Sequence, residues 1–85
     1  MAPIALTFYS RPGCHLCDEM KEIVGAVAPE LDCTVSEVDI SGEPELEARY
    51  ATEIPVLLVN GRKAFKYRLT ERELRKRLRA EEEGR

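Results

Sequence analysis

The sequence has 85 residues and a mass of 9.6 kDa, which allows a single small domain over residues 1–85 and excludes a multi-domain enzyme. Its composition, 44% hydrophobic and 34% charged residues, is too polar for a membrane protein and too apolar for a disordered chain. The formal net charge of −3 conceals a split, because residues 1–60 hold three Lys or Arg against eleven Asp or Glu (−8), whereas residues 61–85 hold ten against five (+5).

The N-terminal residues predict a cytoplasmic protein. Residues 1–9 lack the basic start, the apolar stretch and the small-residue cleavage site of a signal peptide. In the cytoplasm, a pair of cysteines spaced CxxC, here Cys14 and Cys17, is more typical of a redox or metal site than of a structural disulfide. Cys33 makes the number of cysteines odd, so all three cannot pair within one chain.

Hydrophobic periods divide the first half of the chain into two strands and two helices. Residues 4–9 are apolar on both alternating faces, which indicates a strand that is covered on both sides. Residues 14–28 carry apolar side chains at helical spacing and are followed by Pro29. Residues 33–40 are strand-like and β-branched, and residues 43–51 are expected to form a short helix with a proline in its first turn.

A β-hairpin is predicted next. Residues 56–59 are fully apolar, Asn60-Gly61 is the preferred two-residue turn, and residues 62–66 can return antiparallel. A first β-α-β unit makes the first two strands parallel. The predicted order is therefore β-α-β-α-β-β-α, an α/β fold with a four-stranded mixed sheet flanked by three helices, which are expected to cover both faces of the sheet.

The last helix is predicted to begin after Thr70, because Thr70 and Glu73 spell a capping box. Leu69 before the cap and Leu74 after the first turn form a hydrophobic staple, and the helix is expected to lie on the surface. Its expected ion pairs at i,i+4 spacing are Glu71 with Arg75 and Glu73 with Arg77.

The CxxC pair falls at the start of the first predicted helix. A thiolate there gains from the helix dipole and from unpaired N–H groups, which lower its pKa, so Cys14 is the expected nucleophile. Cys17 lies about one turn further on the same helix face and can attack a mixed disulfide formed at Cys14. Arg11 adds positive charge near the thiolate, as does His15 when it is protonated.

Roles without redox chemistry also remain open for these residues. A structural zinc site needs four ligands, and only Cys33 and His15 are left to complete one. Cys14 and Cys17 could also be buried and inert. Cys33 is expected to be a small hydrophobe, and His15 is either a tuning residue or simply exposed on the surface.

Two segments resemble glutaredoxins: Tyr9 to Cys17, which resembles their active-site entry, and Ile54 to Gly61, which resembles their proline-hairpin segment. The resemblance covers nearly the whole chain, with the elements in the same order. The chain looks most like the divergent, short, bacterial group of glutaredoxin-like proteins. The resemblance implies a thioredoxin fold with Pro55 in the cis form beside the cysteines. It also implies that the backbone of Ile54 pairs with extended substrate.

The chain departs from glutaredoxins that use glutathione. Those proteins carry a Gly-Gly pair and then an acidic pair after the hairpin, where this sequence has Phe65-Lys66 and Arg68-Leu69. Arg11 does match the basic residue that meets a glutathione carboxylate in the family. Glutathione is therefore retained only as a possible co-substrate, and Lys66 and Arg68 are expected to give the site a positive rim that prefers acidic partners.

The leading hypothesis is a dithiol glutaredoxin-like disulfide oxidoreductase, with Cys14 and Cys17 catalytic and neither a metal nor an organic cofactor. Its expected partners are a disulfide-containing protein or small thiol and a thiol reductant or reductase. No nucleic acid or membrane partner is expected, and the protein is expected to be a monomer. The predicted substrate-binding residues are Arg11, Ile54, Pro55, Lys66 and Arg68.

Two other classes of function stay open. One is an iron-sulfur or metal carrier, in which two chains each contribute Cys14 and exogenous thiols complete the ligand set. The other is a redox sensor or adaptor that reacts at Cys14 without turnover.

Overall fold

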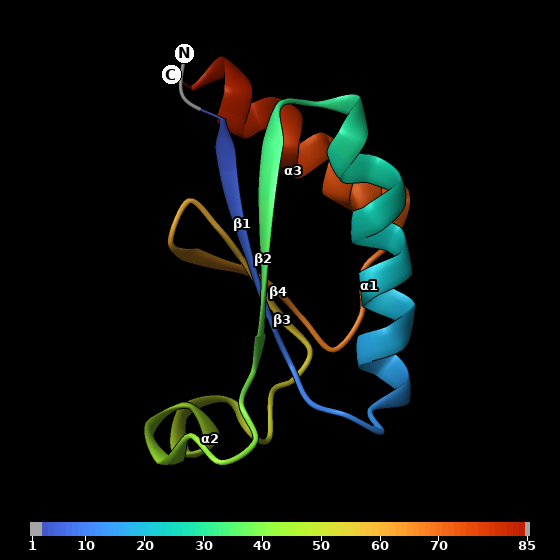
Figure 1. Ribbon diagram of the computed structural model, residues 1–85. Helices are drawn as coiled ribbons and strands as arrows, with labels where there is room; N and C mark the ends of the chain where they lie inside the picture. The colour runs from blue at the N-terminus through green and yellow to red at the C-terminus, as the bar shows by residue number, and fades with distance from the viewer. Residues whose placement is uncertain (1–2, 85) are drawn as a thin grey trace.

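A four-stranded mixed sheet organises the computed structural model, which describes residues 3–84 (Figure 1). Its strands run in the order β2-β1-β3-β4, with β1 parallel to β2 and antiparallel to β3, and with β3 antiparallel to β4. The predicted mixed sheet is confirmed. The strand bounds are β1 Ile4–Ser10, β2 Cys33–Asp39, β3 Val56–Val59 and β4 Arg62–Lys66.

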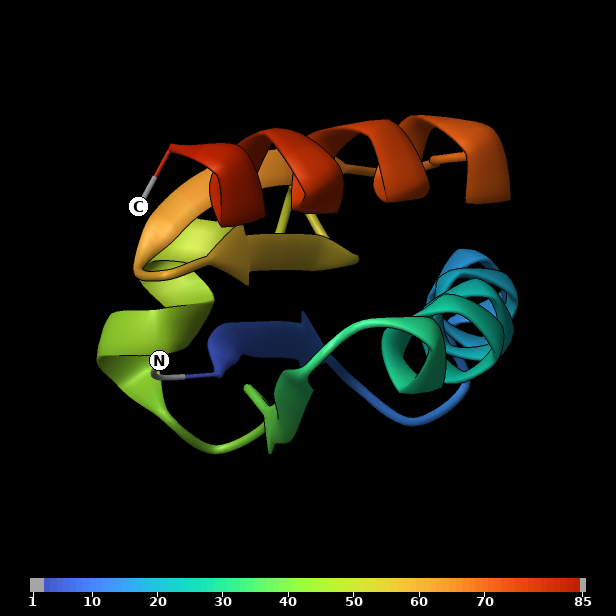
Figure 2. The same cartoon turned by 90° about the horizontal axis from the view of Figure 1, so that it is seen from above.

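Three α-helices flank the sheet, and they confirm the predicted β-α-β-α-β-β-α order. They are α1 (His15–Val27), α2 (Pro44–Tyr50) and α3 (Glu71–Glu83), and a short 3₁₀ turn, Ala28–Glu30, follows α1. Helices α1 and α3 lie on one face of the sheet and α2 lies on the other (Figures 1 and 2). Within residues 3–84, no helix has the length and apolar character needed to cross a membrane.

The main core lies between the sheet and the two longer helices. Alternate residues of β1 point into it, and Ile4, Leu6 and Phe8 are at most 2% exposed. The helices contribute their apolar stripes to the same cluster, which is how amphipathic helices and one sheet face form a core. These helical core residues are Met20, Val24 and Val27 of α1 and Leu74 and Leu78 of α3.

The opposite face of the sheet is covered over only part of its length. Tyr9 stacks on Tyr50 of α2 with ring centroids 4.5 Å apart, whereas Ala5, on the same face of β1, is exposed. The neighbouring strand β2 presents exposed Thr34 and Ser36 there. The expectation that both faces are covered was wrong for this region, because α2 has only seven residues and does not reach it.

Helix α3 begins with the predicted capping box. The Thr70 hydroxyl accepts the Glu73 N–H, and the Glu73 carboxylate accepts the Thr70 N–H at 2.9 Å. The predicted Glu71–Arg75 pair is present at 2.9 Å. The predicted Glu73–Arg77 pair was wrong, because the cap already occupies the Glu73 carboxylate, and Arg77 instead pairs with Glu81 at 2.7 Å.

The hairpin turn also ties distant elements together. Asn60 and Gly61 both have positive φ, 50° and 82°, as a two-residue turn matched to strand twist requires. The Asn60 side chain accepts the N–H of Ala5 at 2.9 Å and donates to Glu81 at 2.8 Å. One residue therefore joins the hairpin to the first strand and to the last helix.

We expect Asn60→Ala to lower the free energy of unfolding by about 1–3 kcal/mol, because it loses both side-chain hydrogen bonds and a residue that tolerates the left-handed conformation. Asn60→Gly keeps the turn and loses only the bonds, so it should cost roughly half as much. Chemical denaturation of the two variants measures the difference. Equal losses would show that the conformation contributes nothing.

A bidentate ion pair joins the 3₁₀ turn after α1 to α3. Arg75 donates to both carboxylate oxygens of Glu30, at 2.8 and 2.7 Å. These hydrogen bonds hold the pKa of Glu30 below its ordinary value of 4.5. A carboxyl whose pKa is lowered by folding stabilises the protein above its unfolded pKa, and this contribution is lost as the pH falls through the folded pKa.

The Glu30→Gln variant should therefore have a lower Tm than wild type at about pH 7, and the gap should close towards about pH 3. Thermal unfolding across this range measures the effect. Glu22→Gln, an exposed position on α1, is the matched control and should show no such convergence. A Tm gap that is independent of pH would contradict the assignment.

Candidate active site

The loop between β1 and α1 places a cysteine at a helix start. Ser10 ends β1 and its carbonyl accepts the N–H of Ile40, which anchors the loop to the sheet edge. Gly13 has φ 77°, a conformation that favours glycine, so the chain can turn sharply into the helix. Cys14 is the N-cap of α1, and its carbonyl accepts the first helical hydrogen bond from Asp18.

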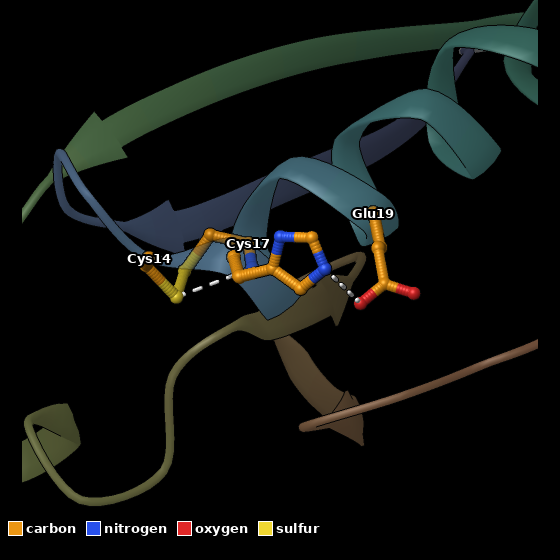
Figure 3. Close-up of a disulfide and its surroundings, with 4 residues drawn as sticks. Cys14, Cys17 and Glu19 are labelled. Atoms are coloured by element: carbon orange, nitrogen blue, oxygen red, sulfur yellow. Dashed lines mark hydrogen bonds and ion pairs between the residues drawn. A yellow bond between two sulfur atoms is a disulfide. The ribbon is translucent and has the colours of Figure 1, made fainter.

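Cys14 and Cys17 form a disulfide at this helix start, with their Cα atoms 5.1 Å apart (Figure 3). The sulfur of Cys14 also accepts the N–H of Cys17 at 3.1 Å, as an N-cap side chain does. Exposure separates the two cysteines. Cys14 is partly exposed, whereas Cys17 is only 3% exposed and belongs to the core.

The proline segment lies beside this loop. Tyr9 pairs with Val56, so Pro55 comes next to the end of β1, where the cysteine loop begins. The Ile54–Pro55 peptide is cis, as the resemblance to glutaredoxins implies. The N–H of Ile54 donates to the carbonyl of Tyr50 at 3.0 Å. Substrate pairing through that N–H would therefore have to replace an existing hydrogen bond.

The predicted basic residues do not gather in one place. Arg11 lines a cavity of about 320 Å³ between α1 and β2, together with Cys17. Arg68 lines a separate cavity of about 430 Å³ between α1 and the loop before α3, together with Leu16. The Lys66 ammonium lies over the ring of Tyr67, 5.4 Å from its centroid. The positive charge is thus divided between the two sides of α1.

His15 and Cys33 are outside these cavities. The His15 side chain is 88% exposed, and its Nε2 lies 3.5 Å from Glu19 one turn along the helix (Figure 3). Cys33 is partly buried and packs against the core, as expected of a small hydrophobe. Among residues 3–84, no group of three or more His, Cys, Asp or Glu side chains is arranged to hold a metal ion.

Tyr67 is a candidate site residue that the sequence pattern did not indicate. It lies between Lys66 and Arg68, which were both predicted, and it lines the cavity beside Leu16. Its phenol donates to the carbonyl of Thr52 at 2.9 Å. The available signal was an aromatic residue at the end of a strand, which by itself indicates nothing about these contacts.

Comparison with known proteins agrees with this geometry. A family model described as glutaredoxin-like domain (DUF836) matches residues 5–79. The chain belongs to this glutaredoxin-like family. It is 31% identical over 77 residues to the glutaredoxin-like protein YDR286C homolog of Dictyostelium discoideum, a match covering 84% of this chain and 71% of that protein.

Solved structures support the same assignment. The protein XcR50 from X. campestris superposes on this glutaredoxin-like chain with a TM-score of 0.75 and 34% identity, over 88% of this chain and 96% of that one. A mutant thioredoxin from Halobacterium salinarum matches with a TM-score of 0.66 over 91% and 73% of the two chains, and its 18% identity supports the fold alone. The glutaredoxin-like domain therefore has a thioredoxin fold, and its family membership indicates a redox-type function.

Proposed function

We propose that this glutaredoxin-like chain is a thiol-disulfide oxidoreductase that reduces disulfides through Cys14 and Cys17. The observation that carries the proposal is the disulfide between a partly exposed N-cap cysteine and a buried cysteine one turn later. In the reduced form, the N–H groups at the start of α1 stabilise the Cys14 thiolate. An incoming disulfide meets Cys14 before it can reach Cys17.

The reaction has two exchange steps. The Cys14 thiolate attacks one sulfur of the substrate disulfide, forms a mixed disulfide and releases the other sulfur as a thiolate. Cys17 then loses its proton to solvent and attacks the Cys14 sulfur, which closes the Cys14–Cys17 disulfide and releases the second substrate thiolate. Two electrons pass to the substrate, and a separate thiol or dithiol reductant restores the reduced pair. The exchange itself uses neither a metal nor an organic cofactor.

Substrate is proposed to bind over the segment beside the cysteine loop. Ile54 and Pro55 form its floor, because the strand register brings them next to the end of β1. Arg11 on one side and Lys66 and Arg68 on the other supply positive charge that favours acidic partners.

Trapping tests the function directly. A Cys17→Ser variant keeps the attacking thiolate but cannot release its partner, so it should accumulate mixed disulfides that mass spectrometry identifies. Glutathione adducts and protein adducts distinguish the two substrate classes. Cys14→Ser combined with Cys17→Ser is the control and should trap nothing. Equal trapping by both variants would refute the assignment of Cys14.

Reversing the charge at Lys66 and Arg68 should weaken the preference for anionic substrates. We expect Lys66→Glu with Arg68→Glu to lower kcat/KM for an anionic disulfide about tenfold at low salt, with little change for neutral 2-hydroxyethyl disulfide. The difference should shrink as salt is added, because these side chains are exposed.

A matched control separates a local effect from one of net charge. Lys76→Glu with Arg79→Glu makes the same change in charge at exposed positions further along α3. It should leave the ratio of kcat/KM for the two disulfides within about twofold of wild type. An equal loss in both double variants would assign the effect to net charge alone.

A further inference from the structure

Tyr67 forms two hydrogen bonds with the segment that ends in Pro55. Its backbone N–H donates to the carbonyl of Pro55 at 2.9 Å, and its phenol donates to the carbonyl of Thr52 at 2.9 Å. The side chain must therefore extend along residues 52–55. In Figure 1, the loop between β4 and α3 passes beside the segment that leads into β3.

The backbone of Tyr67 has a conformation that its residue type does not favour. Its φ is 66°, in the left-handed region where an aromatic residue is uncommon. The side chain is 42% exposed, so burial of the ring in the core does not account for this conformation. The contacts with residues 52–55 are what hold it there. Unfavourable backbone conformations of this kind concentrate at ligand-binding sites.

The segment beneath Tyr67 is the one on which substrate is proposed to bind. Ile54 is 9% exposed and Pro55 is below 2%, although both belong to a loop. The N–H of Ile54 is already bonded to Tyr50. A small ligand that lies along residues 52–55 must therefore displace the Tyr67 side chain, and one that pairs with the Ile54 N–H must also replace its bond to Tyr50.

We propose that Tyr67 determines substrate specificity by shielding residues 52–55 against small peptide thiols such as glutathione. This inference rests on the proposed function of the same site. A tripeptide offers few groups to replace the phenol's hydrogen bond. An extended segment of a protein can instead bind through contacts in the cavity lined by Leu16 and Arg68, which leaves the phenol on the Thr52 carbonyl. Protein disulfides are thus favoured over glutathione disulfide.

Two substitutions at Tyr67 separate the effect of its hydrogen bond to Thr52 from the effect of its ring. Tyr67→Phe keeps the ring and removes the hydrogen bond to Thr52. Tyr67→Gly removes the whole side chain and suits the left-handed backbone, so the fold and the N–H bond to Pro55 are retained. Tyr9→Phe is the matched control, because it removes a phenol hydroxyl from a ring that stacks on Tyr50 instead.

The test is a titration of the oxidised protein with S-methylglutathione, which cannot exchange, followed by NMR at the Ile54 amide. Binding should tighten about three- to tenfold in Tyr67→Phe, the effect of one hydrogen bond, and at least as much in Tyr67→Gly. Tyr9→Phe should match wild type. Affinities of both Tyr67 variants within twofold of wild type, or no binding by any of the proteins, would overturn the inference.

Exchange rates provide a second and separate measurement. In the reduced Cys17→Ser background, Cys14 attacks glutathione disulfide, forms the Cys14–glutathione mixed disulfide and releases glutathione thiolate. Tyr67→Gly should raise this rate at least threefold while changing the rate with a protein disulfide less than twofold. Equal increases for both disulfides would overturn the role in specificity. Loss of all exchange would refute the proposed function, while the titration would still decide the role of Tyr67.

Discussion

Cys14→Ser should lower the rate of disulfide reduction by about a thousandfold or more, because a serine hydroxyl is not ionised near neutral pH and cannot replace a thiolate nucleophile. Cys14 is the partly exposed N-cap of α1, so it is the cysteine that both reaches substrate and receives the helix N–H groups. Cys17 is 3% exposed and lacks that access. The Cys14→Ser and Cys17→Ser variants should therefore differ in which step they lose. Only Cys17→Ser should still form mixed disulfides with substrate.

Steady-state reduction of a protein disulfide and single-turnover formation of the mixed disulfide measure these two outcomes. Cys33→Ala is the matched control, because it removes a cysteine that packs against the core outside both cavities. It should retain at least about half of the wild-type rate. Mixed disulfides formed as readily through Cys17 as through Cys14 would reverse the assignment of roles.

Phe8→Ala should have the largest effect on stability, a loss of about 3–5 kcal/mol in the free energy of unfolding. Phe8 is 2% exposed on the core face of β1, and it lines the cavity that also borders Cys17. Removing its ring enlarges a space that the surrounding strands and helix cannot close. A small domain has only about 5–15 kcal/mol of stability, so the loss would be a large part of it.

Denaturant unfolding measures this loss as a lower midpoint with an unchanged slope. Val35→Ala provides the comparison, because Val35 lies on the same side of the sheet as Phe8 but is 48% exposed. Its loss should stay below about 1 kcal/mol. Similar losses at the two positions would show that burial does not govern stability on this face.

Most of the fold follows from signals local in the sequence. The Asn60-Gly61 turn and the capping box at Thr70 depend on residues at most three apart, and the structure contains both. The extent of sheet coverage is a tertiary property and was predicted incorrectly. The apolar residues of β1 indicate burial on both sides, but the length of α2 leaves Ala5 uncovered.

In the candidate site, too, some features follow from local sequence and others depend on tertiary packing. Cys14 at a helix start is readable from sequence, because the CxxC spacing and the helical period coincide there. The separation of Arg11 from Arg68 depends on which side of α1 each loop passes, and no local pattern records it. The contacts of Tyr67 with Thr52 and Pro55 join residues 12 to 15 positions apart, which places them beyond reasoning from local patterns.

The hydrogen bonds of Asn60 have a consequence for how the molecule opens locally. Its backbone and side chain both bond Ala5, and the same side chain holds Glu81 near the end of α3. Fraying usually begins at chain ends, but here the first strand and the last helix are fastened to a common turn. The amide of Ala5 should therefore exchange with solvent in the same cooperative event as those near Glu81, so that β1 and the last turns of α3 open as one unit.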